Sequence, residues 1–331
     1  MTSMQRVTGF VASLSFSGLA LAWGATGHMA VGSIADRMIA GTNTARQVRN
    51  ILGSNLRAAS VWADCAKDVS EKTLQYGADG VFPECAIYEN DASKARMVAF
   101  VTRNLDNCNP PPGAERCHKQ YHYTDVAIQR ERYAKGVVGT SDHDIVSAVS
   151  ASIAVLQGGN APAPFRIVGK REALRLLSHY VGDIHQPLHV AAVYLDAGGN
   201  LVDPDQRQFD PTTETRGGND ILHAGRKLHG AWDDASDALD ADNLPPGALD
   251  AARAVPITAG PLSGWSTAWA TESLIEGKAA YKDLRYSGED AQHRYVATVA
   301  PGYDSLKSDI QRRQLIRAGA RLAQILMAIW P

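Results

Sequence analysis

Apolar residues recur every three or four positions along five stretches of the chain, which is the spacing of an amphipathic helix. The stretches that predict helices are 28–39, 142–157, 170–184, 267–284 and 304–330. In the second stretch Ile145, Val149 and Ile153 form one apolar stripe, with Asp142 as the expected N-cap and Gly158 past the end. Arg and Lys interrupt the last stretch, so we expect a core-facing terminal helix there and not a membrane helix.

Period-two alternation, the mark of half-buried strands, is scarce in this sequence. Loops rich in Gly, Pro and polar residues are expected at 107–113, 158–164 and 196–218. The last is long enough to indicate a functional or mobile loop. Because no internal repeat and no linker divides the sequence, we predict a single all-α, mostly helical domain over residues 23–331.

Composition excludes disorder and a broad cationic surface. Hydrophobic residues make up 45% of the 331 residues and charged residues 21%, which is enough apolar material for a sizeable core. Lys and Arg number 33 against 35 Asp and Glu, a net charge of -2. If the ligand is a polyanion, the positive charge must therefore be local or come from metal.

The N-terminus has the pattern of a secretory signal peptide. Arg6 supplies a short positive region, residues 11–21 are apolar, and Ala20-Leu21-Ala22 is a small-x-small cleavage site. The alternative is an uncleaved anchor, for which the segment is short. We expect residues 1–22 to be removed, leaving a secreted or periplasmic protein that begins at Trp23.

Four cysteines in an exported chain favour disulfides. Three pairings are possible, and the shortest closures, Cys65–Cys85 and Cys108–Cys117, are preferred. The alternative, zinc thiolates, needs CxxC-like clustering that this sequence lacks.

Histidine and aspartate occur together at ligand spacing in the segment HYVGDIHQPLH. His179 and Asp183 are four residues apart, so on a helix both side chains lie on one face. Pro187 should end that helix, which leaves His189 free to point elsewhere. One such pair alone is more often a surface or capping interaction than a metal site.

The same spacing recurs in LHGAWDD, where His229 precedes Asp233 by four residues. Further candidate residues stand singly or in short groups: Trp23, His28, Asp64, Lys67, His122, Tyr123 and Asp125. Two pairs and several isolated ligands are much harder to explain as surface contacts. Imidazole nitrogen and carboxylate oxygen without thiolate form a ligand set typical of hydrolytic zinc sites.

Six segments, in this order, resemble one family. They are WGATGH at 23–28, WAD at 62–64, HYTD at 122–125, HYVGDIHQPLH at 179–189, GGN at 217–219 and LHGAWD at 228–233. The chain resembles the zinc-dependent, single-strand-specific type I nucleases of fungi and plants, which also have 3'-nucleotidase activity. That family shares a superfamily with the bacterial zinc phospholipase C.

The resemblance implies three zinc ions per chain. The implied ligands are Asp64, His122, His179 and Asp183 for one ion; Asp183 again, His28 and the α-amine and carbonyl oxygen of Trp23 for a second; and His189, His229 and Asp233 for the third. A free α-amine is a good nitrogen ligand once deprotonated, at a reference pKa of about 8. Export would therefore be coupled to assembly of the site.

The resemblance also implies roles in catalysis for Asp64 and Lys67. Asp64 would orient the attacking hydroxide, and Lys67 would stabilise the pentacoordinate phosphorus. Lys67 without the resemblance is better explained as a solvated surface lysine. The three divalent ions outweigh their carboxylate ligands in charge, so the cleft would attract a phosphodiester without a basic patch.

Base recognition is implied at Tyr123 and Asp125, as a stacking ring and a hydrogen-bond acceptor for the base edge. Stacking tolerates any base but needs an unpaired one. Without the resemblance, a structural role is an equally good interpretation, with Tyr123 in the core and Asp125 as a helix cap. Asn219 matches the family's asparagine near the phosphate, although a second GGN at 198–200 leaves that alignment open.

The expected function is an exported zinc endonuclease that cleaves single-stranded DNA and RNA to 5'-phosphate products and acts on 3'-nucleotides. The alternatives are a phospholipase C-like lipid phosphodiesterase and a non-catalytic zinc-binding protein. Tyr123 and Asp125 favour nucleotides, and no interfacial amphipathic face is apparent, so we expect no stable membrane association. We expect a monomer.

Overall fold

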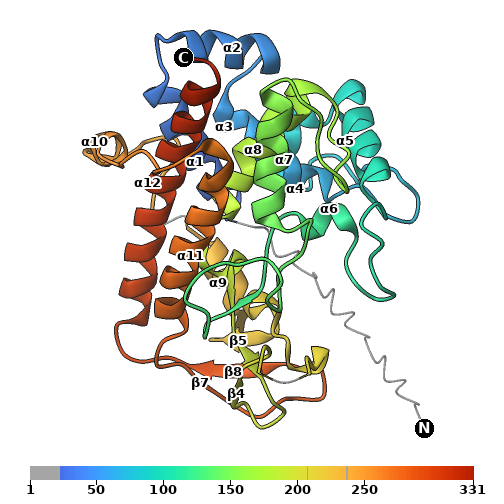
Figure 1. The fold of residues 1–331 in the computed structure, drawn as a ribbon, viewed down its shortest axis with the longest axis vertical. Helices are drawn as coiled ribbons and strands as arrows, with labels where there is room; N and C mark the ends of the chain where they lie inside the picture. The colour runs from blue at the N-terminus through green and yellow to red at the C-terminus, as the bar shows by residue number, and fades with distance from the viewer. Residues whose placement is uncertain (1–22, 207, 236–237) are drawn as a thin grey trace, which may run out of the picture.

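The computed structural model describes residues 23–206, 208–235 and 238–331. Helices fill the upper part of the view in Figure 1, and short strands lie at the bottom. The α-helices are α1 (Ala25–Met38), α2 (Asn43–Leu52), α3 (Leu56–Ala59), α4 (Trp62–Ala66), α5 (Asp91–Arg103), α6 (Cys117–Gln120), α7 (Ile145–Leu156), α8 (Gly169–Asp183), α9 (Leu228–Asp233), α10 (Ala248–Arg253), α11 (Trp265–Tyr281) and α12 (Tyr303–Ile329). The 3-10 helices are η1 (Pro83–Tyr88), η2 (Pro187–His189), η3 (Pro211–Thr213), η4 (Arg216–Gly218) and η5 (Leu262–Gly264).

The strands are short and form small sheets. They are β1 (Val126–Ala127), β2 (Ala191–Ala192), β3 (Tyr194–Leu195), β4 (Leu201–Val202), β5 (Ile221–His223), β6 (Arg226–Lys227), β7 (Arg285–Tyr286) and β8 (Tyr295–Thr298). β1 pairs with β2 in parallel, β3 with β4 antiparallel, and the third sheet has the order β6-β5-β8-β7. Strands of this length contribute little core of their own, so the prediction of a mostly helical domain is confirmed.

The five helices predicted from periodicity are α1, α7, α8, α11 and α12, with ends that differ by a few residues. The predicted N-cap of α7 is wrong. Asp144, not Asp142, caps the helix by accepting a hydrogen bond from the Ser147 backbone N–H at 3.0 Å. Asp144 directly precedes the first helical turn, so its side chain can reach the Ser147 N–H, whereas Asp142 pairs with His143. Gly158 follows the helix in a left-handed conformation, φ 95°.

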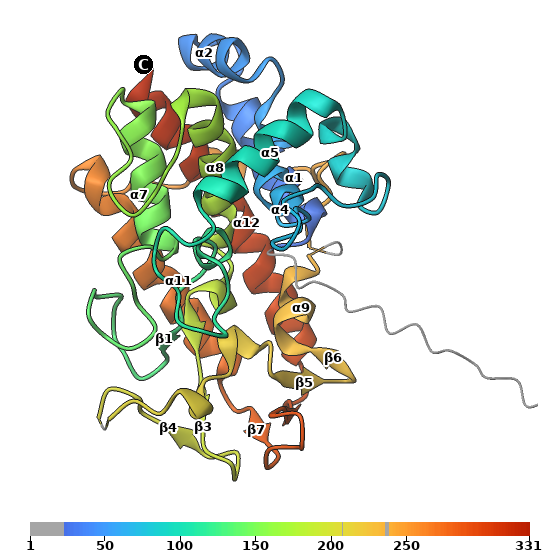
Figure 2. The same ribbon diagram turned by 90° about the vertical axis from the view of Figure 1, so that its right-hand side faces the viewer.

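Helix α8 lies in the middle of the helical part (Figures 1 and 2). Every residue from Ala173 to Asp183 is buried. The helices α1, α3, α4, α7 and α12 all contact α8. Its ligand-type residues therefore project into the protein interior, not into solvent.

Close packing of α1 against α12 supports one side of this core. A Cβ atom built on Gly319 would lie 2.6 Å from the Ile34 Cβ. Only glycine allows that approach. The helix pair brings the start of α1, where His28 lies, against the C-terminal helix.

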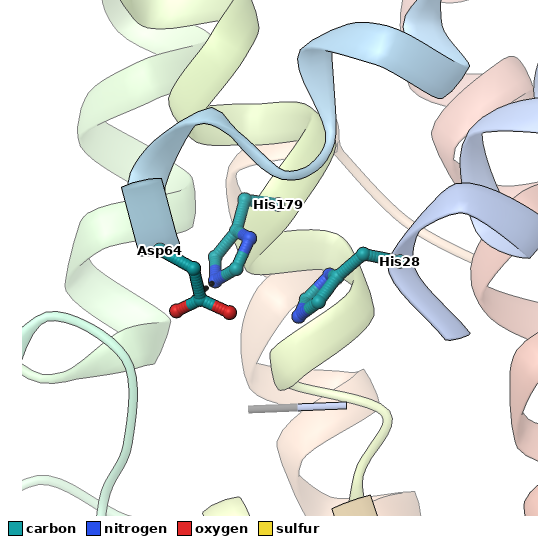
Figure 3. A group of neighbouring side chains, drawn as sticks. All are labelled: His28, Asp64 and His179. Atoms are coloured by element: carbon teal, nitrogen blue, oxygen red, sulfur yellow. Dashed lines mark ion pairs between the residues drawn. The ribbon is translucent and has the colours of Figure 1, made fainter. Parts of the chain in front are cut away.

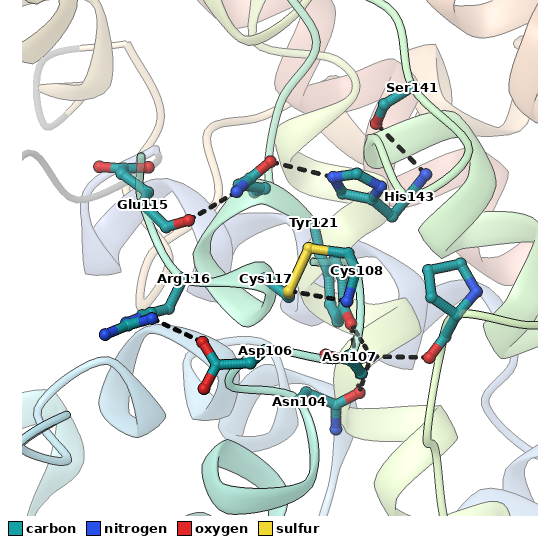
Figure 4. The surroundings of a disulfide bond; sticks show 12 residues. Asn104, Asp106, Asn107, Cys108, Glu115, Arg116, Cys117, Tyr121, Ser141 and His143 are labelled. Carbon is teal, nitrogen blue, oxygen red and sulfur yellow. Dashed lines mark hydrogen bonds and ion pairs between the residues drawn. A yellow bond between two sulfur atoms is a disulfide. The ribbon is translucent and has the colours of Figure 1, made fainter. Parts of the chain in front are cut away.

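Both disulfides follow the shortest closures. Cys65 pairs with Cys85 with Cα atoms 5.6 Å apart, and Cys108 pairs with Cys117 at 5.7 Å. Figure 4 shows the second bond beside Asn107, whose amide donates to the Tyr121 hydroxyl at 2.6 Å. The bond thus fixes the base of the loop that was expected at 107–113.

Three further expectations concern the N-terminus, membrane-spanning helices and the loop at 196–218. The signal peptide expected at 1–22 lies outside the described residues. Among the residues that the structure describes, no helix combines the length and apolar character needed to cross a membrane. The expected loop at 196–218 contains β4, η3 and η4, so it is partly ordered by local structure.

Candidate metal centre

Three elements far apart in the sequence bring His28, Asp64 and His179 together (Figure 3). They lie on α1, α4 and α8, and one ligand atom from each lies within 4.8 Å of the others. The rings of His28 and His179 stack with centroids 3.8 Å apart. The three side chains converge on one point in the interior.

Asp183 joins this group to a second one. The spacing on α8 places its Oδ2 3.1 Å from Nε2 of His179, and the same oxygen lies 2.9 Å from Nδ1 of His122. Its other oxygen, Oδ1, lies 3.3 Å from Nε2 of His28. The two oxygens of Asp183 therefore face different imidazoles, so this carboxylate could help to hold more than one cation.

A further group consists of His189 on η2 with His229 and Asp233 on α9. The two Nε2 atoms are 3.1 Å apart, and each lies 3.6 Å from an oxygen of Asp233. The Gln186 side-chain amide donates to the Asp233 Oδ1 at 2.8 Å and so holds that carboxylate in place.

Backbone carbonyls fix which ring nitrogen of three histidines carries a proton. Nδ1 donates from His179 to Ser60 (2.6 Å), from His189 to His122 (2.8 Å) and from His229 to Gly217 (2.8 Å). A carbonyl oxygen can only accept a hydrogen bond, so Nδ1 carries the proton. In the neutral rings Nε2 therefore has a free lone pair. These lone pairs point into the two groups, as metal-binding imidazoles do.

Several buried polar atoms in these groups have no hydrogen-bond partner among the described residues. They are both ring nitrogens of His28 and one carboxylate oxygen each of Asp64 (Oδ1), Asp183 (Oδ1) and Asp233 (Oδ2). An unsatisfied buried polar atom costs about 1–3 kcal/mol. A divalent cation would satisfy them, and nitrogen with carboxylate oxygen is the donor set that zinc takes, so the residues fit a metal.

The charges of these groups also suit a cation. Burial lowers the pKa of His28, His122 and His229, which keeps these rings neutral. Burial by itself would raise the pKa of Asp64, but Lys67 and the nearby imidazoles bring it down to about 2. The carboxylate is therefore ionised at neutral pH.

At His179 burial acts against the carboxylates. Burial lowers its pKa, but Asp183 and Asp64 together raise that pKa above the ordinary value. A proton and a metal ion therefore compete for the same nitrogen.

A pocket of about 660 Å³ opens onto the metal groups. The predicted site residues that line this pocket are Asp64, Lys67, His122, Tyr123, Asp125, His189, Asn219 and His229. All the residues predicted to contact substrate thus face the same space as four of the predicted ligands.

The second GGN segment, at 198–200, belongs to the β3–β4 turn, where the Asn200 side-chain amide donates a hydrogen bond to Asp196. Of the two asparagines, Asn219 is therefore the one at the pocket.

A model of the S1/P1 Nuclease family matches residues 23–331. The chain belongs to the S1/P1 nuclease family. Among curated proteins, Endonuclease 1 of Arabidopsis thaliana is 27% identical over 224 residues, which are 63% of this chain and 68% of the relative. The nuclease therefore hydrolyses phosphodiester bonds.

Lys67 of the nuclease is not a solvated surface lysine. Its Nζ lies 2.8 Å from Oδ1 of Asp64, and the pair faces the pocket. Burial lowers the pKa of Lys67, but Asp64 and Asp183 outweigh it and raise the pKa above the ordinary value. The ammonium is therefore charged at neutral pH.

Tyr123 and Asp125 form one wall of the pocket. The Tyr123 hydroxyl donates to Glu115 Oε2 at 3.1 Å, and burial keeps its pKa well above the ordinary value. Burial and the nearby Glu214 also raise the pKa of Asp125 well above its usual range. A protonated Asp125 can donate to a base edge as well as accept from it.

Sequence reasoning missed several charged residues that line the pocket, among them Glu115, Glu214 and Arg216. Glu115 lies in the loop closed by the Cys108–Cys117 bond, and the other two lie at the end of the expected long loop. Those loops were expected, but nothing in the sequence indicated that both return to the metal groups.

Proposed function

We propose that the nuclease is an exported, zinc-dependent endonuclease of single-stranded DNA and RNA that leaves 5'-phosphates and also acts on 3'-nucleotides. The observation that carries the proposal is the convergence of histidine lone pairs and unpartnered carboxylate oxygens on a pocket that also holds an aromatic ring. That donor set suits zinc, and the ring suits an unpaired base.

Three zinc ions are proposed. Their proposed ligands are Asp64, His122, His179 and Asp183; then Asp183, His28 and the amine and carbonyl of Trp23; then His189, His229 and Asp233. When bound, such ions lower the pKa of water toward about 7 and polarise the phosphoryl oxygens.

The surroundings of Trp23 support its proposed part. The residue is fully buried, and its indole Nε1 donates to the Gly182 carbonyl at 2.8 Å. The backbone N–H of Gly24 donates to the Asp233 carbonyl at 2.7 Å. The first residues of the proposed mature chain are thus fixed next to two proposed ligands.

The residues of the pocket divide the remaining work. Asp64 forms an ion pair with Lys67 and can hold a water aimed at phosphorus, while Lys67 faces the negative charge that develops there. Tyr123 offers its ring to a base, and Asp125 meets the base edge. A duplex hides both faces of each base, so this arrangement supports single-strand preference.

Elemental analysis of the mature protein, combined with one set of assays, tests the proposal. We expect about three zinc ions per chain, rapid cleavage of single-stranded DNA and RNA, much slower cleavage of duplex DNA, and no cleavage of phosphatidylcholine. Chelation should abolish activity, and zinc should restore it. Equal rates on single strands and duplex would contradict the strand preference, and cleavage of lipid alone would contradict the substrate class.

A further inference from the structure

A second depression, outside the metal centre, lies between α5 and α8 over Trp62 of α4. It has a volume of about 270 Å³ and shares no lining residue with the metal pocket. We call it the arginine groove; its charged lining residues are Arg96, Arg103, Arg171, Glu172 and Arg175. Four guanidinium groups thus face one carboxylate.

Among the residues that the structure describes, only one of the four arginines pairs with a carboxylate. Arg103 binds both oxygens of Glu172, at 2.7 and 2.8 Å. Arg171 donates Nε to the Ile51 carbonyl at 2.7 Å, and Arg96 donates to the carbonyl of Ala92, one turn before it. Backbone carbonyls carry no net charge, so the positive charge of the groove is not balanced.

Arg175 is the strongest indication that an anion belongs here. It is 7% exposed, and among the described residues its guanidinium has no hydrogen bond and no ion pair. Its guanidinium lies over the rings of Trp62 and Tyr88, 5.4 and 5.0 Å from their centroids. Stacking attracts the guanidinium to the two rings but satisfies none of its N–H donors.

The stacking leaves the edges of that guanidinium for an acceptor. Burial lowers the pKa of Arg175, and the positive charges of Arg171 and Arg96 lower it further despite Tyr88 and Glu172. An anion in the groove would remove that repulsion. A guanidinium fork matches the oxygens of a phosphate in two parallel hydrogen bonds.

We propose that the arginine groove binds a phosphate group. The group can come from a free phosphate compound or from the backbone of a nucleic-acid strand that extends beyond the metal pocket. His179 lies one turn further along α8 than Arg175, so the groove adjoins the metal centre without sharing its ligands. The inference goes beyond the proposed function and does not depend on which metal the nuclease holds.

Equilibrium dialysis of the metal-loaded nuclease against radiolabelled orthophosphate tests the proposal. The test variant is Arg96→Gln/Arg171→Gln, both exposed; the control is Arg253→Gln/Arg312→Gln, which removes the same charge from exposed positions on α10 and α12. Phosphate on the metals is common to all three proteins. We expect the test variant to bind one phosphate per chain about tenfold more weakly or not at all, with the control unchanged. Identical isotherms for all three would overturn the proposal.

A second arm identifies the source of the phosphate. The dissociation constant of a cleavage-resistant ten-residue phosphorothioate oligonucleotide is measured for the same proteins. Weaker binding of both probes assigns the groove to a strand, and weaker binding of orthophosphate alone assigns it to a free anion. Dinucleotide cleavage should stay unchanged in the test variant, and a single Arg96→Gln variant checks that a lost site does not reflect misfolding.

Discussion

At the scale of single residues, the metal centre depends on hydrogen bonds that leave the metal-binding nitrogens of its histidines free. The carbonyls of Ser60, His122 and Gly217 take the Nδ1 proton from three imidazoles. Their Nε2 atoms are therefore unprotonated and correctly oriented before any cation binds. The periodicity of the sequence indicates which residues face each other on α8 and α9, but these carbonyls come from distant loops that no local pattern identifies.

Asp183 is the residue on which both proposed ligand sets of α8 depend. Asp183→Asn keeps the shape but removes the charge and one oxygen. We expect zinc content to fall from about three to about one per chain, and kcat/KM on single-stranded DNA to fall more than about a hundredfold. Asp142→Asn, an exposed aspartate, is the control. Unchanged zinc content by elemental analysis in Asp183→Asn would contradict the bridging role.

Tyr123 separates stacking from hydrogen bonding. Tyr123→Phe keeps the ring and loses only the bond to Glu115, so KM should change little. Tyr123→Ala loses a stacking partner worth about 1–3 kcal/mol per base, which predicts a KM roughly 5- to 150-fold higher on single-stranded DNA. Steady-state kinetics of both variants checks this. Equal KM values for the two would mean that the ring does not contact a base.

At the scale of elements, the long helices were predictable and the strands were not. α7, α8 and α12 repeat apolar residues over several turns, so their periodicity is unambiguous. Strands of two to four residues, such as β1 and β8, are too short to show alternation. Their pairing, Val126 with Ala191 for example, depends on contacts between distant segments.

The two disulfides support different walls of the pocket. Cys65 follows Asp64 and its partner Cys85 lines the pocket, whereas the Cys108–Cys117 loop carries Glu115. Closing loops of 20 and 9 residues stabilises the fold by about 3 kcal/mol each in the chain-entropy picture.

Replacing each pair by serine should therefore have separable effects on activity. We expect both double variants to lose a similar amount of stability in urea unfolding. Cys65→Ser/Cys85→Ser should lower kcat, because Asp64 loses its support, and Cys108→Ser/Cys117→Ser should mainly raise KM through Tyr123. The reverse assignment in steady-state kinetics would show that the walls are held by other contacts.

At the scale of the whole molecule, near-neutral charge is compatible with a polyanionic substrate only if positive charge is local. The net charge of -2 indicated that the positive charge must be local or come from metal. The structure places Lys67 and the metal groups in one pocket. The family resemblance supplied the ligand residues because they lie in short motifs. Glu115, Glu214 and Arg216 could not be predicted, since loop closure over long sequence separations brings them to the pocket.

The proposed amine ligand at Trp23 couples the site to the start of the chain. A protein with an extra Met before Trp23 keeps every side chain but replaces the amine by an amide, which is a poor nitrogen ligand. We expect about two zinc ions instead of three and a large loss of rate, measured by elemental analysis and single-stranded DNA cleavage. The matched control is the same protein trimmed to Trp23. Three zinc ions and full rate in the extended form would rule out this ligand.

The burial of Trp23 also has a practical side for anyone who produces this nuclease. Its indole is anchored to Gly182 in the interior, whereas Pro331 at the other end is exposed and only its carbonyl is engaged, by the Asn43 amide. An affinity handle or an immobilisation linker fused after Pro331 preserves that carbonyl as a peptide bond. Placed ahead of Trp23, the same handle would turn the proposed amine ligand into an amide.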